Sequence, residues 1–172
     1  LGAHPRVVGI GECGLDFFRN HAPAEDQERA FRAQIGVARD LGKPLIIHTR
    51  DAAEETIAIL DAEAADLTIL LHCFSLVDHV EAVAERGWFT SFAGQITFAK
   101  ADAIRAAAAA LPAERLLVET DSPYLTPVPN RGRPNQPANV VDTLSRLADV
   151  RGITTAECEA LTDANAGRLF GW

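Results

Sequence analysis

The chain has 172 residues, of which 48% are hydrophobic and 23% charged, a length and balance typical of one globular domain with its own core. No apolar run reaches the roughly 18–20 residues of a membrane span, so no membrane association is expected. The formal net charge of −8 gives no support to bulk electrostatic binding of nucleic acid, although divalent cations in a carboxylate-lined site can still bind phosphates. The three cysteines are an odd number without CxxC spacing, which favours a reducing, cytoplasmic setting.

A short apolar run followed by a helical stretch recurs along the chain. The predicted strands span residues 7–13, 44–49, 68–73, 88–93 and 116–121. The predicted helices span residues 23–41, about 51–60, 77–86, 101–111, 136–150 and 154–170. Capping boxes are expected for two of them, at Asp51 with Glu54 and at Thr154 with Glu157. Five of the nine prolines fall between 123 and 137 and predict a long rigid loop.

Strands that alternate with helices predict βαβ units and a parallel sheet. The pattern alone leaves both a doubly wound sheet and a barrel open. A (β/α)8 barrel of the TIM type needs eight strands, so under that interpretation residues 1–172 form a single incomplete domain with about five of the eight βα units. The chain has no methionine and begins with Leu1, from which we expect an N-terminally truncated protein.

Four of the five predicted strands end in a potential metal ligand, namely Glu12, His48, His72 and Asp121. The carboxyl ends of parallel strands are where sites are assembled from several strands. Two imidazoles and two carboxylates suit Zn²⁺, Mn²⁺, Fe²⁺ or Mg²⁺. A single histidine at a strand end is more often a hydrogen-bonding residue, but the recurrence at four strands favours a metal site. By contrast, alternation along the strand predicts that Cys73 points into the core.

Five segments resemble the TatD family of metal-dependent hydrolases, in that family's order and spacing over the whole chain. They are GECGLDFFRN (11–20), IIHTRDA (46–52), LHCFS (71–75), ETDSPYLTPVPNRGRPNQP (119–137) and NAGRLFGW (165–172). The resemblance implies an amidohydrolase-like (β/α)8 barrel and divalent-metal-dependent deoxyribonuclease activity, with DNA as the substrate. It also implies two divalent metal ions per complete site, with Mg, Mn and Zn not distinguished.

The resemblance assigns a role to each of the four strand-end residues. Glu12 resembles the carboxylate that bridges two metals, and His48 and His72 resemble ligands of the second metal. Asp121 resembles a ligand of the first metal that also orients or deprotonates the attacking water, so Asp121 and Glu12 are the expected catalytic residues.

Three departures from the family pattern concern the same site. The family's first strand has a His-x-His pair for the first metal, and this chain contains none, which leaves that metal site incomplete. Leu76 stands where the family usually has glycine, and Gln136 where glutamate is common.

Five further residues are expected around the metals. Arg50, Arg131 and Arg133 are candidates for contact with phosphate oxygens, with a solvated surface role as the alternative. Asp16 and Glu119 are candidates for orienting the ligands.

The leading hypothesis is therefore a metal-dependent DNA phosphodiesterase. One alternative is a hydrolase with the same site that acts on another ester or amide, such as an aminoacyl ester on transfer RNA, because specificity lies in the loops. A second is a non-catalytic fragment with residual metal binding, which we expect to be unstable or to self-associate through exposed strand edges. The sequence indicates no protein partner.

Overall fold

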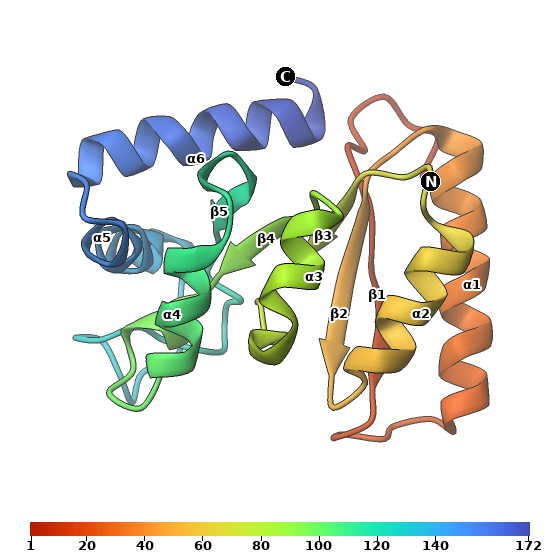
Figure 1. Ribbon diagram of the computed structural model, residues 1–172, viewed down its shortest axis with the longest axis horizontal. Coiled ribbons are helices and arrows are strands. Elements are labelled where there is room, and N and C mark those ends of the chain that lie inside the picture. Colours follow the sequence, from red (N-terminus) through yellow and green to blue (C-terminus); the bar gives the residue numbers. More distant parts are fainter.

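The computed structural model describes residues 1–172 and contains one five-stranded sheet in the order β1-β2-β3-β4-β5 (Figure 1). All four neighbouring pairs of strands are parallel. The strands are β1 (Ile10–Asp16), β2 (Leu45–Arg50), β3 (Ile69–Leu71), β4 (Phe89–Phe92) and β5 (Leu116–Val118). Spatial order follows chain order with no reversal, whereas a doubly wound sheet reverses at a switch point. The sheet is thus a partial barrel wall, and this resolves the choice that the sequence left open.

Helices connect the strands, as the alternating pattern predicted. The α-helices are α1 (Ala24–Leu41), α2 (Ala53–Glu63), α3 (Val80–Glu85), α4 (Asp102–Ala110), α5 (Val140–Arg151) and α6 (Thr155–Phe170). Short 3-10 segments are η1 (Val77–His79), η2 (Gly94–Thr97), η3 (Ala113–Arg115) and η4 (Pro137–Asn139). No helix or strand lies between β5 and η4, so the proline-rich loop is confirmed.

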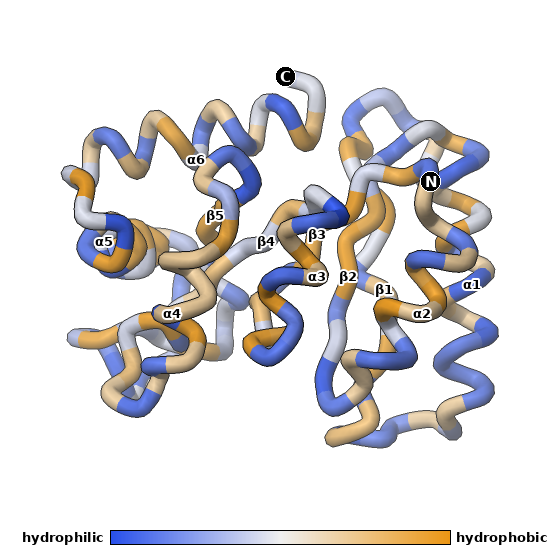
Figure 2. Tube along the Cα trace, viewed as in Figure 1, coloured by the Kyte–Doolittle hydropathy of each residue, from blue (hydrophilic) through white to orange (hydrophobic).

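The two faces of the sheet pack differently. Along β2, buried residues alternate with half-buried ones, so that Ile47 faces the main core while Ile46 and His48 face the other way. The main core is a cluster of 27 buried residues between the sheet and the helices. A second cluster of four buried residues includes Leu70 on β3 and Leu169 near the end of α6. Figure 2 shows hydrophobic colours along the first part of β2, hydrophilic colours at its carboxyl end, and alternating colours along the helices, as expected for helices with one face on a core.

Several local predictions differ from the structure. β3 ends at Leu71 and β5 at Val118 rather than at residues 73 and 121, so His72 and Asp121 lie beyond their strands. The first strand begins at Ile10 rather than residue 7, because its pairing with β2 begins at Ile10 opposite Leu45. The expected capping box at Asp51 and Glu54 is wrong, because the residue before α2 is Ala52 and no side chain caps this helix. The capping box of Thr154 and Glu157 at the start of α6 is confirmed.

None of the helices combines the length and the apolar character that crossing a membrane requires.

Candidate metal centre and the cavity around it

Polar side chains gather on the sheet face opposite the main core, toward the carboxyl ends of the strands. His48 lies on this face of β2, next to Gly14 of the paired strand β1. His72 follows β3 directly, and Asp121 lies in the loop after β5. Glu12 differs from the prediction, because it lies inside β1 rather than at its end, and its side chain is 57% exposed. The difference arises because β1 continues to Asp16 rather than ending at residue 13.

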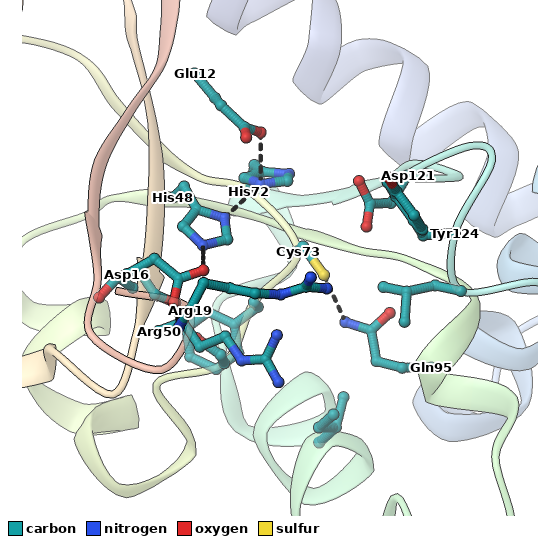
Figure 3. A pocket seen from close by; sticks show the side chains of 15 residues that line it. Glu12, Asp16, Arg19, His48, Arg50, His72, Cys73, Gln95, Asp121 and Tyr124 are labelled. Carbon is teal, nitrogen blue, oxygen red and sulfur yellow. Dashed lines mark hydrogen bonds and ion pairs between the residues drawn. The ribbon is translucent and has the colours of Figure 1, made fainter. Parts of the chain in front are cut away.

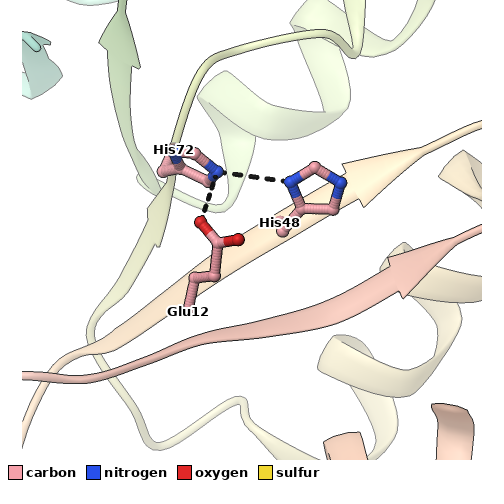
Figure 4. Close-up of side chains that lie close together, drawn as sticks. All are labelled: Glu12, His48 and His72. Carbon is pink, nitrogen blue, oxygen red and sulfur yellow. Dashed lines mark hydrogen bonds and ion pairs between the residues drawn. The ribbon is translucent and has the colours of Figure 1, made fainter. Parts of the chain in front are cut away.

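Glu12, His48 and His72 converge from three neighbouring strands (Figure 4). The Nε2 atom of His72 lies 2.9 Å from Oε2 of Glu12 and 3.3 Å from Nδ1 of His48. One ligand atom from each residue lies within 4.8 Å of the other two. Two imidazole nitrogens and a carboxylate oxygen at these separations form a donor set that fits a divalent transition metal or zinc.

Asp16 fixes the ring of His48 from the side away from this group. Its Oδ2 atom lies 3.2 Å from Nε2 of His48, and its Oδ1 atom accepts a hydrogen bond of 2.7 Å from the backbone N–H of Arg19. Burial raises the pKa of Asp16, but the hydrogen bonds from Arg19 and His48 lower it overall. A carboxylate at the far nitrogen of a ligating histidine selects the tautomer that leaves the other nitrogen free to bind a metal.

Glu119 fixes the ring of His72 in the way that Asp16 fixes the ring of His48. The Nδ1 atom of His72 lies 3.0 Å from Oε1 of Glu119, and the hydroxyl of Ser91 donates to the other carboxylate oxygen. Burial lowers the pKa of His72, yet the hydrogen bond and charge of Glu119 raise it overall. Burial likewise raises the pKa of Glu119, whereas His72 and Ser91 lower it overall. The pair is therefore an ionised carboxylate held against a basic imidazole.

Asp121 belongs to a second group of possible ligands. Its carboxylate, one oxygen of Glu119 and one nitrogen of His72 lie within 4.8 Å of one another. Burial raises the pKa of Asp121, and the charges of Glu119 and Glu12 add to this, against an opposing effect of His72. His72 thus belongs to both groups.

A cavity of about 580 Å³ opens over these residues (Figure 3). Its walls include three carboxylates, from Glu12, Asp16 and Asp121, and two guanidinium groups, from Arg19 and Arg50. The arginines lie on the same side as Asp16, and Tyr124 lies beside Asp121 on the other side. The cavity therefore combines places for cations at its base with positive charge for an anion on one wall.

The predicted arginines separate into two groups. Arg50 lines the cavity, whereas Arg131 and Arg133 are exposed residues of the proline-rich loop and do not line it. The guanidinium carbon of Arg131 lies 3.8 Å from the centroid of the Phe98 ring.

The prediction that Cys73 points into the core is wrong. Cys73 lines the cavity, and its Sγ atom lies 3.3 Å from Nε2 of Gln95. Alternation fails here because the strand ends at Leu71 and Cys73 has a φ of 46°, outside the extended region.

Sequence reasoning missed several residues of the site, among them Arg19, Ser91, Gln95 and Tyr124. Ser91 was the most accessible to prediction, because it is a polar residue in the middle of β4, a strand that is buried throughout. Arg19 and Tyr124 lie in turns and loops, and Gln95 lies in the short 3-10 segment η2, where periodicity gives no direction for a side chain.

A parallel sheet with imidazoles and carboxylates at its carboxyl edge is an arrangement found in metal-dependent hydrolases. The model of the TatD related DNase family matches residues 1–171, and the chain belongs to that family.

Two curated relatives and one solved structure resemble the chain over almost all of its length. The uncharacterized metal-dependent hydrolase YcfH of Escherichia coli K12 is 43% identical over 99% of this chain, and the 3'-5' ssDNA/RNA exonuclease TatD of the same organism is 41% identical over 99%. The crystal structure of YjjV, a TatD homolog from E. coli K12, superposes with a TM-score of 0.87 over 96% of this chain at 27% identity. The chain spans 65% of the length of YcfH, 68% of TatD and 64% of YjjV.

Proposed function

We propose that the chain forms a single domain of a divalent-metal-dependent hydrolase that cleaves phosphodiester bonds of DNA. The observation that supports this most directly is the convergence of Glu12, His48 and His72, whose ligand atoms lie within 4.8 Å of one another at the base of a cavity. The name of the E. coli relative TatD, a 3'-5' ssDNA/RNA exonuclease, supports a single-stranded nucleic acid as the substrate.

The proposed roles follow from the positions of the side chains. Glu12, His48 and His72 would hold one ion, and Asp121, which is grouped with Glu119 and His72, would face a second. Bound divalent ions lower the pKa of water and neutralise charge on a phosphate. Asp121 accepts the proton of the attacking water, since it lies in the same cavity and has no hydrogen-bonded side-chain partner.

Asp16 and Glu119 keep the two histidines in the tautomers that bind metal. Arg50 contacts a phosphate oxygen of the substrate, because its guanidinium group lines the cavity from the same face of β2 as His48.

The second ion would need ligands beyond Asp121, Glu119 and His72. The chain contains no His-x-His pair, and His72 is shared between the two groups. The test therefore compares the 172-residue chain with a fusion in which the chain is joined to the segment of YcfH that the match leaves uncovered.

The substrates for this comparison are end-labelled single-stranded DNA and an aminoacyl ester of transfer RNA, each with Mg²⁺ or Mn²⁺ and with a chelator as control. Cleavage of DNA by the fusion that the chelator abolishes supports the proposal. Hydrolysis of the aminoacyl ester without cleavage of DNA overturns the proposed substrate while leaving the metal centre in place. No hydrolysis of either substrate overturns the proposed function.

We also propose a reducing, cytoplasmic location, supported by three unpaired cysteines, of which Cys13 and Cys158 are buried. Reaction with a thiol reagent in intact cells, compared with purified protein under oxidising conditions, tests this.

A further inference from the structure

Two exposed aromatic rings are associated with the cavity, one as part of its lining and the other through contact with a lining residue. Tyr124 is 66% exposed and lines the cavity beside Asp121 (Figure 3). Phe18 is 60% exposed, in the turn that follows β1. The guanidinium carbon of Arg50, which lines the cavity, lies 3.7 Å from the centroid of the Phe18 ring. Large exposed rings beside a charged cavity indicate recognition of a ligand that has flat apolar faces.

The backbone of Tyr124 is held in place although its ring is exposed. Its N–H donates a hydrogen bond of 2.8 Å to the carbonyl of Asp121. Its carbonyl accepts a hydrogen bond of 2.7 Å from the side-chain amide of Asn135, which also donates to the carbonyl of Thr120 at 2.8 Å. Asn135 is only 6% exposed, so Tyr124 is fixed to the same short segment that positions Asp121.

Phe18 is fixed beside Arg50, which belongs to the opposite wall. The N–H of the preceding residue, Phe17, donates a hydrogen bond of 2.9 Å to the carbonyl of Arg50 at the end of β2. The planar guanidinium group of Arg50 then lies over the Phe18 ring. Arginine in this position keeps its donors available for a phosphate while its plane stacks on an aromatic ring.

Because the net charge of the chain is negative, apolar contacts matter more for binding a nucleic acid. The formal charge of −8 repels a polyanion overall, and Arg19 and Arg50 are the cationic side chains that line the cavity. Stacking of a base on an aromatic ring does not depend on charge, and every unpaired base offers two faces. In a duplex those faces are covered by neighbouring bases, so such rings bind single strands selectively.

We propose that Tyr124 on one wall, and the stacked Phe18–Arg50 pair on the other, bind unpaired bases of a single strand on either side of the phosphate at the metal centre. The proposal rests on the proposed phosphodiesterase function and names the binding mode of its substrate.

The test measures binding of a short single-stranded DNA that has non-cleavable phosphorothioate linkages and 2-aminopurine at one position. The fluorescence of 2-aminopurine falls when the base stacks on an aromatic ring. Phe18→Leu and Tyr124→Leu remove the rings while keeping apolar bulk. Tyr124→Phe keeps the ring, and Trp172→Leu removes an aromatic side chain that is 73% exposed and does not line the cavity. Thermal denaturation of each variant checks that the fold is unchanged.

We expect Phe18→Leu and Tyr124→Leu each to weaken binding by about 5- to 150-fold, the range for loss of one stacked base. Each should also reduce the quenching of 2-aminopurine. Tyr124→Phe and Trp172→Leu should stay within about twofold of the unaltered chain. A strand with abasic sites should bind the unaltered chain and the two leucine variants equally.

Unchanged affinity and quenching in both leucine variants overturns the proposal, as does absence of quenching with the unaltered chain. An equal loss of affinity for the abasic strand also overturns it, because the rings then act on the backbone. The metal-dependent cleavage assay separates the two proposals. Stacking without cleavage of any phosphodiester contradicts the function alone, and cleavage without stacking contradicts only the binding mode.

Discussion

At the scale of single residues, His72 occupies the central position of the site. One ring nitrogen lies 2.9 Å from Glu12 and the other lies 3.0 Å from Glu119, so the ring connects both groups of possible ligands. The side chain is only 11% exposed, and its orientation is therefore fixed by its partners rather than by solvent. His48 is held in the same manner between His72 and Asp16.

Gly14 makes room for this arrangement. A Cβ atom at this position would lie 2.0 Å from the backbone oxygen of His48, and its φ of 138° strains any other residue. We expect Gly14→Ala to reduce the free energy of unfolding by about 1–3 kcal/mol and to weaken metal binding by displacing His48. Urea denaturation and Mn²⁺ titration measure the two effects.

Gly36 provides the matched control for this substitution. It lies inside α1, and a Cβ atom there meets nothing within 4 Å. Gly36→Ala should increase stability by about 0.5–1 kcal/mol and leave metal binding unchanged. If Gly14→Ala binds Mn²⁺ as tightly as Gly36→Ala, the register of β1 and β2 does not position His48.

At the scale of elements, the last helix is joined to the sheet by buried hydrogen bonds as well as by apolar packing. Asn165 of α6 is fully buried, and its side-chain amide donates to the carbonyls of Ala113 and Leu116 at 2.8 and 2.7 Å. Leu169, one turn further on, packs with Leu70 and Leu117 on the face of the sheet where the site lies. Part of the NAGRLFGW motif thus has a structural role.

Asn165→Ala should destabilise the fold by about 1–3 kcal/mol, because it removes the donor from the buried carbonyl of Leu116 and from the half-buried carbonyl of Ala113. Thr155→Ala, at an exposed position of the same helix, should change stability by no more than about 0.5 kcal/mol. Urea denaturation followed by circular dichroism measures both. Equal stability of the two variants would contradict the proposed anchoring of α6.

An ion pair joins α2 to the end of α3. Arg86 donates two hydrogen bonds of 2.6 Å to Asp61, and these lower the pKa of Asp61 from its ordinary value of 3.8 despite the opposing effect of burial. A lowered pKa contributes stability that is present above the ordinary value and is lost as the pH falls through the folded-state value. Because the pair is exposed, this contribution is about 0.2–1 kcal/mol.

We therefore expect Asp61→Asn to destabilise the chain slightly at pH 7 and not at all once the pH lies below the folded-state pKa of Asp61. Denaturation curves of both proteins over this range, well below pH 4, measure the difference. A difference that grows as the pH falls would contradict this assignment.

At the scale of the whole molecule, the sequence predicted the order of strands and helices and the region of the site. Apolar periodicity located all five strands and six helices, since each has one face on a core. It did not predict the direction of Cys73 or the positions of Arg19 and Tyr124, because loop geometry depends on hydrogen bonds such as those of Asn135. β1 and β5 are the edge strands of the sheet. Self-association of the chain through these edges stays a prediction.

We expect the affinity of the chain for DNA to depend only weakly on salt concentration, because the chain is negatively charged overall. With Arg19 and Arg50 as the positive groups of the cavity, the slope of log affinity against log salt should be roughly −1 to −2 for a single strand. Arg50→Gln should reduce the slope by about 0.7, whereas Arg29→Gln, an equal change of charge on α1, should not. Fluorescence anisotropy across a salt series measures this, and a slope of about −5 would indicate an extended basic surface instead.

A calorimetric titration with Mn²⁺ tests the proposed metal centre most directly. It compares the unaltered chain with His72→Ala and with a control at an exposed histidine, His21→Ala. We expect the unaltered chain and His21→Ala to bind the ion equally. His72→Ala should bind Mn²⁺ at least about 100-fold more weakly while keeping its circular dichroism spectrum. This loss is larger than the usual effect of replacing a residue that only positions a metal ligand. Unchanged Mn²⁺ affinity in folded His72→Ala, or no binding by the unaltered chain, would contradict a metal centre at Glu12, His48 and His72.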